Sequence, residues 1–193
     1  MAHRSRKKSS ALEMGPPDRP SPWRLTRRDV ARRELCAAIE MFFNAGDPVV
    51  VHLLVAACED ICIPVARKAG RKPFRDEIDE MVKPEYLGSW RERQKAPYNF
   101  FKHGGADPDE VLPFFDPKMN DMKIFGATQD YLRAFQELPT SATVFVGWHM
   151  ATYPALLTEF GQKMFGTILD EFSGMDETQR RAHARERCSQ RQS

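Results

Sequence analysis

The sequence has almost no excess charge of either sign: 29 Lys and Arg residues stand against 27 Asp and Glu, for a formal net charge of +2. A balance this close gives no bulk electrostatic argument for binding nucleic acids or membranes. Hydrophobic residues make up 41% of the chain, which excludes a wholly disordered protein. The composition also excludes collagen-like, disulfide-scaffold and membrane-embedded proteins.

Cysteine is scarce, and none of the four residues forms a CxxC pair. The segment from Met1 to Ser10 is basic and polar, with no apolar stretch after it, so we expect no secretory signal. Reduced thiols in a cytoplasmic protein are therefore expected. The longest uncharged stretch, Leu138 to Thr158, contains prolines and several hydroxyl side chains, which favours a buried helix and no membrane contact.

Several strong catalytic and cofactor-binding signatures are missing. GxGxxG and GxxxxGK[ST] are absent, so no standard phosphate-binding loop is expected. HExxH, ExxH and GxSxG are absent too, which argues against zincins, di-iron bundles and α/β-hydrolases. Cys58 and Cys62 lie one helical turn apart and could bind a metal, but their apolar stripe favours packing as small hydrophobes. We predict no metal site and no cofactor.

The chain divides into a helical domain at residues 26–175 and two polar tails. Residues 1–25 are basic and interrupted by prolines, which predicts a disordered arm that could contact RNA or an acidic partner. Residues 176–193 are polar and Arg-rich, and we expect them to begin as a helix and fray. The domain is long enough for a single hydrophobic core.

Apolar residues recur at three- and four-residue spacing along most of the domain, which predicts helices. Thr26 is placed to cap the first helix, which Asn44–Gly46 should end, and an Asp-Pro pair at 47–48 should begin a second that ends at Gly70. The predicted fold is all-α, a compact single-domain bundle of five to seven helices. Further helices are expected at about 75–82, 84–103 with an interruption near Pro97, 117–136 and 140–164.

His52 is the first candidate for a functional side chain. On its predicted helix it shares a face with Glu59 and Asp60, displaced from the apolar stripe. A histidine and two carboxylates on one face could orient one another or bind a ligand cation. The alternative is that His52 hydrogen-bonds to a neighbouring group and fixes helix packing, while both carboxylates face water.

The most informative segment is NFFKH at residues 99–103, followed by two glycines and an acidic loop. Asn99 and His103 share one helix face, and Lys102 and His103 lie in the last turn, where the helix dipole favours cations. Such a helix end could bind phosphate or another polar ligand, or it could serve only as a C-cap. His149, next to Trp148 in an uncharged helix, is expected to be a core histidine.

Three stretches resemble a family of uncharacterised bacterial helical proteins: RREL from Arg32, GDPVxxHxLxxA from Gly46, and NFFKH with a following DPD from Asn99. The resemblance covers roughly residues 30 to 135. The last stretch is also distantly similar to HEPN domains, helical bundles that bind or cut RNA. In those enzymes an Arg, an adjacent polar residue and a later histidine act on the ribose and phosphate.

The match to the HEPN pattern is incomplete, because only three residues separate Asn99 from His103 and nine separate Arg93 from it. The resemblance therefore carries over to His103 alone as a catalytic candidate, with Asn99 and Lys102 as candidate phosphate ligands. It implies a non-catalytic HEPN-like bundle rather than an active nuclease.

Three functions follow from these candidates. The favoured function is a non-enzymatic module that binds a partner protein or small ligand and could form a homo-oligomer. The second is an HEPN-like RNA-binding protein or metal-independent ribonuclease, with His103 as the base. The third is a metal-dependent helical enzyme. We predict that His52 and His103 share one surface hollow, which would favour the second and third functions, whereas burial of each in a separate environment would favour the first. The ligand-binding candidates are His52, Glu59, Asn99, Lys102 and His103, and the metal-dependent alternative adds Asp60 and His149.

Overall fold

The computed structural model describes residues 24–105 and 107–190, so most of the predicted basic arm, residues 1–23, lies outside the described residues. Within the described ranges the chain is all-α, with no strand, as the sequence predicts. Nine α-helices and two short 3-10 helices form there, above the expected five to seven. In chain order they are α1 (Arg27–Phe43), α2 (Pro48–Lys68), α3 (Phe74–Met81), α4 (Pro84–Lys102), η1 (Pro117–Met119), α5 (Asn120–Phe135), α6 (Thr140–Thr152), η2 (Pro154–Leu156), α7 (Glu159–Met164), α8 (Gly166–Glu171) and α9 (Glu177–Ser189).

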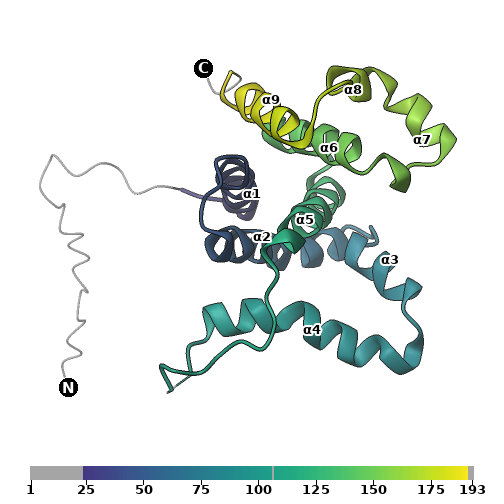
Figure 1. Cartoon of the computed structure of the whole chain (residues 1–193). Coiled ribbons are helices and arrows are strands. Elements are labelled where there is room, and N and C mark those ends of the chain that lie inside the picture. The colour runs from purple at the N-terminus through teal and green to yellow at the C-terminus, as the bar shows by residue number, and fades with distance from the viewer. Residues whose placement is uncertain (1–23, 106, 191–193) are drawn as a thin grey trace, which may run out of the picture.

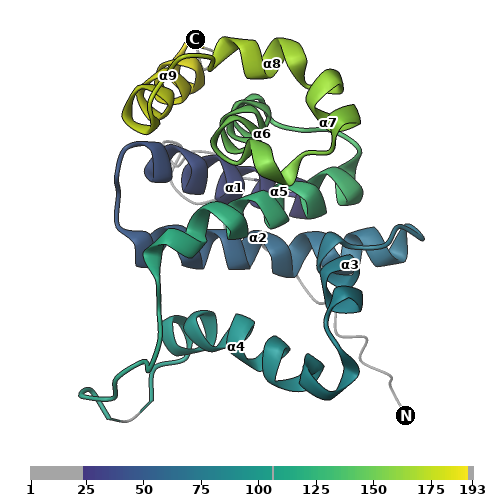
Figure 2. The same cartoon turned by 45° about the vertical axis from the view of Figure 1, so that its right-hand side comes forward.

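The helices are arranged in three tiers (Figures 1 and 2). Helices α6 to α9 lie at one end, α1, α2 and α5 form the middle, and α3 and α4 lie at the other end. Helix α2 packs against both α1 and α5, so it forms the centre of the hydrophobic core. Fully buried side chains in this core include Leu35, Ile39, Val55, Ile124 and Phe145.

The first two helices begin and end as their sequences predict. Thr26 accepts a hydrogen bond from the backbone N–H of Asp29, whose carboxylate accepts in return from the N–H of Thr26, which is a capping box. The side chain of Asp47 accepts from the N–H of Val49 at 2.8 Å and caps the start of α2. Gly70, with φ +71°, follows the end of α2 in the left-handed conformation that glycine adopts easily.

Helix α2 is long and apolar enough to cross a membrane by length and composition alone. Half of its apolar window is buried inside the fold, between α1 and α5. It also contains the buried Glu59 carboxylate. This burial is typical of the core helix of a soluble protein. The uncharged stretch from Leu138 to Thr158 forms α6 and η2. Most of α6 is buried, as the sequence predicts.

The C-terminal part of the chain differs from the expectation. Residues 177–189 form a full helix, α9, that buries Ala184 and Cys188 in the common core rather than fraying as a polar tail. Arg181 anchors α9 to α1, because it donates to the carbonyl of Phe42 at 2.6 Å and lies over the Phe42 ring. The predicted helix at 140–164 is instead broken after Thr152, and η2 begins at Pro154.

Pro97 does not interrupt α4, contrary to the expectation from sequence. The helix runs from Pro84 to Lys102 with Pro97 inside it. A proline lacks the N–H that would bond to the carbonyl four residues earlier, so one helical hydrogen bond is missing at this point. Pro97 is also the only buried residue of α4.

We expect Leu35→Ala to destabilise the protein by about 3 kcal/mol, because Leu35 is fully buried and its truncation leaves a cavity in the middle tier. Leu132→Ala is the matched control: Leu132 is 37% exposed, and the expected loss is below about 1 kcal/mol. Urea denaturation followed by circular dichroism measures both. Equal losses would contradict the assignment of the core to the face of α1 that carries Leu35.

Candidate functional site

A cleft separates α4 from helices α2, α3 and α5. It comprises two adjoining cavities of about 240 Å³ and about 230 Å³. We call the first the apolar compartment and the second the polar compartment. The two compartments adjoin, because they share the lining residues Glu59, Arg75, Gln94, Lys95 and Lys123.

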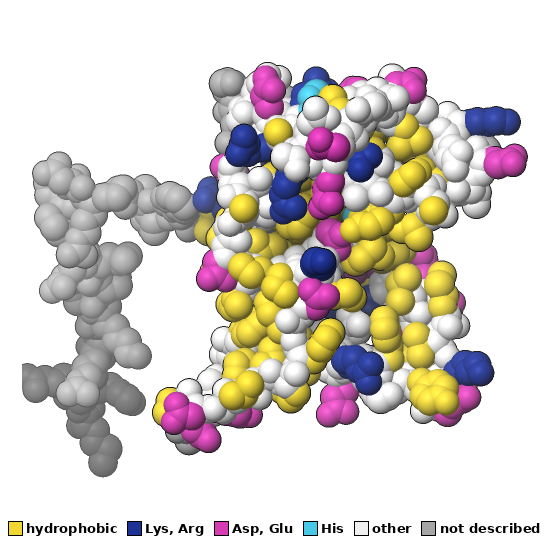
Figure 3. All heavy atoms as spheres, viewed as in Figure 1, with side chains coloured by type: hydrophobic (Ala, Val, Ile, Leu, Met, Phe, Trp, Pro, Cys, Tyr) yellow, Lys and Arg dark blue, Asp and Glu magenta, His cyan; other side chains and the backbone are white. Residues whose placement is uncertain are grey.

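The apolar compartment lies between the first half of α4 and helices α3 and α5. Phe74 and Ile78 line it from α3, Trp90 from α4 and Met122 from α5. Phe74 is held in place by an edge-to-face contact with Phe125, with 5.8 Å between the ring centres. Figure 3 shows hydrophobic side chains gathered on the lower half of the molecule, in two groups with charged side chains between them. This end of the cleft therefore offers an apolar wall on each side.

The polar compartment lies under the second half of α4. Tyr98 donates its hydroxyl to the carboxylate of Asp60 at 3.0 Å, which ties α4 to α2. Lys102 donates to the same hydroxyl oxygen at 3.0 Å, and its ammonium lies 4.9 Å from the centre of the Tyr98 ring. Asn99 and His103 line the same compartment and are exposed. The end of α4 therefore presents several polar side chains to one hollow.

Glu59 lies where the two compartments meet. Its side chain is 8% exposed, and one carboxylate oxygen accepts from Arg75 at 2.6 Å and from Lys123 at 2.8 Å. These three side chains belong to α2, α3 and α5, so the cluster joins three helices. A buried carboxylate is costly unless it is paired, and two cations provide that pairing here.

Asp130 lines the inner wall of the apolar compartment. It accepts a hydrogen bond from the backbone N–H of Phe74 at 2.6 Å, at the first residue of α3. The side chain is almost fully buried. Burial disfavours the charged carboxylate and raises the pKa of Asp130 from its ordinary value of 3.8 to about 6, although the Phe74 hydrogen bond acts in the opposite direction.

The structure brings together four of the five ligand-binding residues that the sequence singled out. Glu59, Asn99, Lys102 and His103 all line the polar compartment. His103 also ends α4, and its backbone N–H donates to the carbonyl of Asn99 at 2.8 Å. The C-cap interpretation and the exposed polar site therefore describe the same residues.

His52, the fifth candidate, does not line this compartment, so the predicted hollow shared by His52 and His103 is wrong. Its imidazole is buried, and Nδ1 lies 3.0 Å from the amide oxygen of Asn120. The rings of Phe101 and Phe115 pack edge-on against it. Burial, with a smaller contribution from Lys123, lowers the pKa of His52 and keeps it neutral. His52 therefore fixes packing beneath the end of α4, as the alternative interpretation held, but Glu59 is buried instead of facing water as that interpretation expected.

The remaining candidates lie elsewhere in the molecule. His149 is a core histidine, as expected: it is 2% exposed and stacks on Phe125 with 4.5 Å between ring centres. Cys58 and Cys62 are fully buried in the hydrophobic core, with 3.7 Å between their sulfurs. Within residues 24–105 and 107–190, no group of three His, Cys, Asp or Glu side chains could hold a metal ion. The geometry of the described residues thus gives no support to the metal-dependent alternative.

Sequence reasoning missed the residues that form most of the cleft. Arg75, Lys123 and Asp130 come from two different helices and share no motif in the chain, whereas Trp90 was already a candidate as an exposed aromatic residue near the polar segment. Their proximity depends on how α3 and α4 fold back over α2 and α5. The sequence feature that could have indicated this cleft is a carboxylate on an otherwise apolar helix, and it indicates Glu59 alone.

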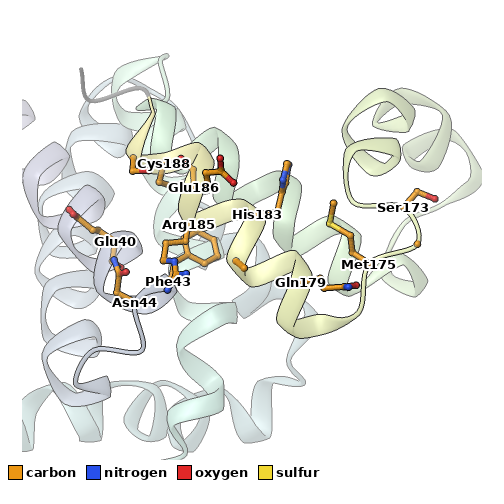
Figure 4. Close-up of a pocket in the computed structure, with 13 residues that line it drawn as sticks. Glu40, Phe43, Asn44, Ser173, Met175, Gln179, His183, Arg185, Glu186 and Cys188 are labelled. Atoms are coloured by element: carbon orange, nitrogen blue, oxygen red, sulfur yellow. Dashed lines mark hydrogen bonds between the residues drawn. The ribbon is translucent and has the colours of Figure 1, made fainter.

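A larger and more open hollow, of about 990 Å³, lies along α9 (Figure 4). In that view Cys188 and Glu186 lie near the α1 side of the helix, whereas His183 projects from another side. The lining side chains therefore spread around α9 instead of converging on one point. The cleft beneath α4 is the better candidate, because side chains from α2, α3, α4 and α5 line it together.

Comparison with known protein families, with curated proteins and with solved structures gives no match to this chain. The assignment of the site therefore rests on the geometry described above.

We predict that Asp130→Asn stabilises the protein at pH 7 by up to about 3 kcal/mol. The pKa of Asp130 is higher in the folded chain than in the unfolded chain, so the folded state binds the proton more tightly. The resulting stability is present below about pH 4 and is lost as the pH rises through about 6. Asparagine keeps the acceptor for the Phe74 N–H and cannot ionise. Urea denaturation from pH 4 to pH 8 measures the effect, and an unchanged pH profile in the variant would refute it.

Proposed function

We propose that this protein is a non-enzymatic helical module that binds a small organic molecule in the cleft beneath α4. The observation that supports this most directly is the joining of an apolar and a polar compartment in one cleft. Binding sites for small molecules are typically concave and mostly apolar, with a few polar groups that fix orientation.

The size of the cleft favours a small ligand over a macromolecule. Each compartment, at about 240 and 230 Å³, is slightly below the range of about 300–1,000 Å³ typical of ligand pockets, and the two adjoining compartments together fall within it. Trp90 and Phe74 supply aromatic walls, and such side chains bury much apolar ligand surface.

Two paired carboxylates and the two buried imidazoles support binding rather than catalysis, and His103 and Asp130 remain as titratable groups of the cleft that could act in catalysis. Glu59 is engaged by two cations, and Asp79 accepts from Arg91 at 2.8 Å. The two buried imidazoles, His52 and His149, do not line either compartment. A general base needs access to the proton that it removes, and neither histidine faces the cleft.

Gly126 of α5 allows a direct test, because it lies on the floor of the apolar compartment. We expect N-phenyl-1-naphthylamine, an uncharged apolar fluorophore, to bind the wild-type protein and gain fluorescence. Gly126→Phe should abolish this binding, since its ring would fill the compartment. Fluorescence titration measures both.

Gly126→Ala is the matched control. An added Cβ would lie 3.8 Å from both Glu59 Oε1 and the Phe74 ring, which is ordinary contact distance. This variant should bind the fluorophore like the wild type and be more stable by about 0.5–1 kcal/mol, because alanine favours a helix over glycine. Equal binding by all three proteins, with Gly126→Phe still folded by circular dichroism, would refute the cleft as the binding site.

We propose RNA binding as the second candidate function, in line with the HEPN-like resemblance. The observation that favours it is the exposure of Lys95, Lys102 and His103 along one face of α4. Lysines on one face can contact successive phosphates, and an imidazole can contact a ribose hydroxyl.

If RNA is the ligand, a short single-stranded RNA should bind with an affinity that falls steeply as salt rises. His103→Ala should then weaken binding severalfold, and electrophoresis of the RNA should show whether any cleavage is lost with it. Filter binding at several salt concentrations is the measurement. Binding by the variant that equals the wild type would exclude this role for His103.

We infer a reducing compartment, the cytosol, as the location of the protein. All four cysteines are free thiols, and three of them are buried. Structural disulfides are the usual state of paired cysteines in oxidising compartments, so free buried thiols favour a reducing one.

A further inference from the structure

Most cations around the cleft are already engaged by a carboxylate. Arg75 and Lys123 both donate to Glu59, and Arg91 donates to Asp79. A guanidinium or ammonium held in this way has much of its charge compensated, so it offers little to a ligand. These residues shape the walls of the cleft rather than supply a free charge.

Lys95 is different. It lines both compartments, it is exposed, and within the described part of the chain no carboxylate lies within ion-pair distance of its ammonium. Lys102, seven residues further along α4, donates to a neutral acceptor, the Tyr98 hydroxyl, so its charge is not cancelled either. Positions seven apart lie on the same face of a helix. The two ammonium groups therefore follow one side of the cleft.

The charge of the polar compartment is positive as a whole. Four Lys and Arg side chains line it against two carboxylates, whereas the whole chain is nearly balanced. This local excess favours an anion in the compartment. The cations are Arg75, Lys95, Lys102 and Lys123, and the carboxylates are Glu59 and Asp60.

We propose that the ligand of this cleft is an amphipathic organic monoanion, a carboxylic acid with an apolar body, whose carboxylate binds Lys95. This inference rests on the proposed function. The apolar chain of the ligand lies between Trp90 and Met122. Lys95 lies at the border of the two compartments, so the carboxylate and the apolar chain bind to adjacent surfaces of the cleft.

A single negative charge fits the cleft better than a phosphate dianion. Glu59 and Asp60 line the same compartment as the ammonium groups of Lys95 and Lys102. Each of these carboxylates repels an anionic head, and the repulsion grows with the charge of the head. A ligand with one carboxylate can pair with Lys95 without bringing its negative charge close to Glu59.

The test is a competition series with three compounds that share an eight-carbon chain and differ in the terminal group: octanoate is an anion, octanol is neutral and octylamine is a cation. Each competitor displaces bound N-phenyl-1-naphthylamine, and the loss of fluorescence gives its affinity. We expect octanoate to bind most tightly and octylamine least tightly. Lys95→Gln should weaken octanoate about threefold to tenfold and leave octanol unchanged, since the ion pair is partly solvent-exposed. Raising salt should weaken octanoate alone.

Arg93→Gln is the matched control, because Arg93 is an exposed cation on α4 that lines neither compartment. It should leave all three affinities unchanged. Equal affinity of octanoate and octanol for the wild type, or an equal effect of Arg93→Gln and Lys95→Gln on octanoate, would overturn the anion assignment. Binding of the uncharged fluorophore would still stand in that case. Failure of the fluorophore to bind would instead refute the proposed function itself.

Discussion

The buried ion cluster at Glu59 is the interaction on which the cleft depends. Glu59 lies on the central core helix α2, and its two partners, Arg75 and Lys123, come from α3 and α5. A carboxylate buried without partners would be strongly destabilising, so the fold of this region must bring both cations to it. The same cluster closes the cleft floor and separates its apolar half from its polar half. The position of α3, and through it the start of α4, follows from this requirement.

Three different contacts hold α4 over the cleft. Arg91 pairs with Asp79 of α3 near its first half, Tyr98 reaches Asp60 of α2, and the Phe101 ring packs on His52 at its end. Arg91 lies near the middle of α4, the other two contacts lie in its second half, and Pro97 is the residue of this helix that is buried. The helix is thus attached at several points along its length, beside the two compartments of the cleft.

The sequence predicts local structure well and the site only in part. Thr26 and Asp47 mark helix starts because capping depends on neighbouring backbone groups. The polar end of α4 was predicted because Asn99 and His103 are close in sequence. The direction in which the His52 side chain points was not predicted, because the rings that bury it, Phe101 and Phe115, are distant from His52 in the sequence. Helix α9 was underestimated because only Ala184 and Cys188 of its mostly polar sequence enter the core.

Pro97 divides α4 at a point between its two anchored halves. The carbonyl of Arg93 has no proline N–H to bond with, so the backbone is least resistant to bending there. Trp90 and Arg91 precede this joint, and Tyr98 and Lys102 follow it. Lys95 also precedes the joint and lines both compartments, so a change in the angle at the joint would move Trp90 and Lys95 together relative to Tyr98 and Lys102, and both compartments would change shape in concert.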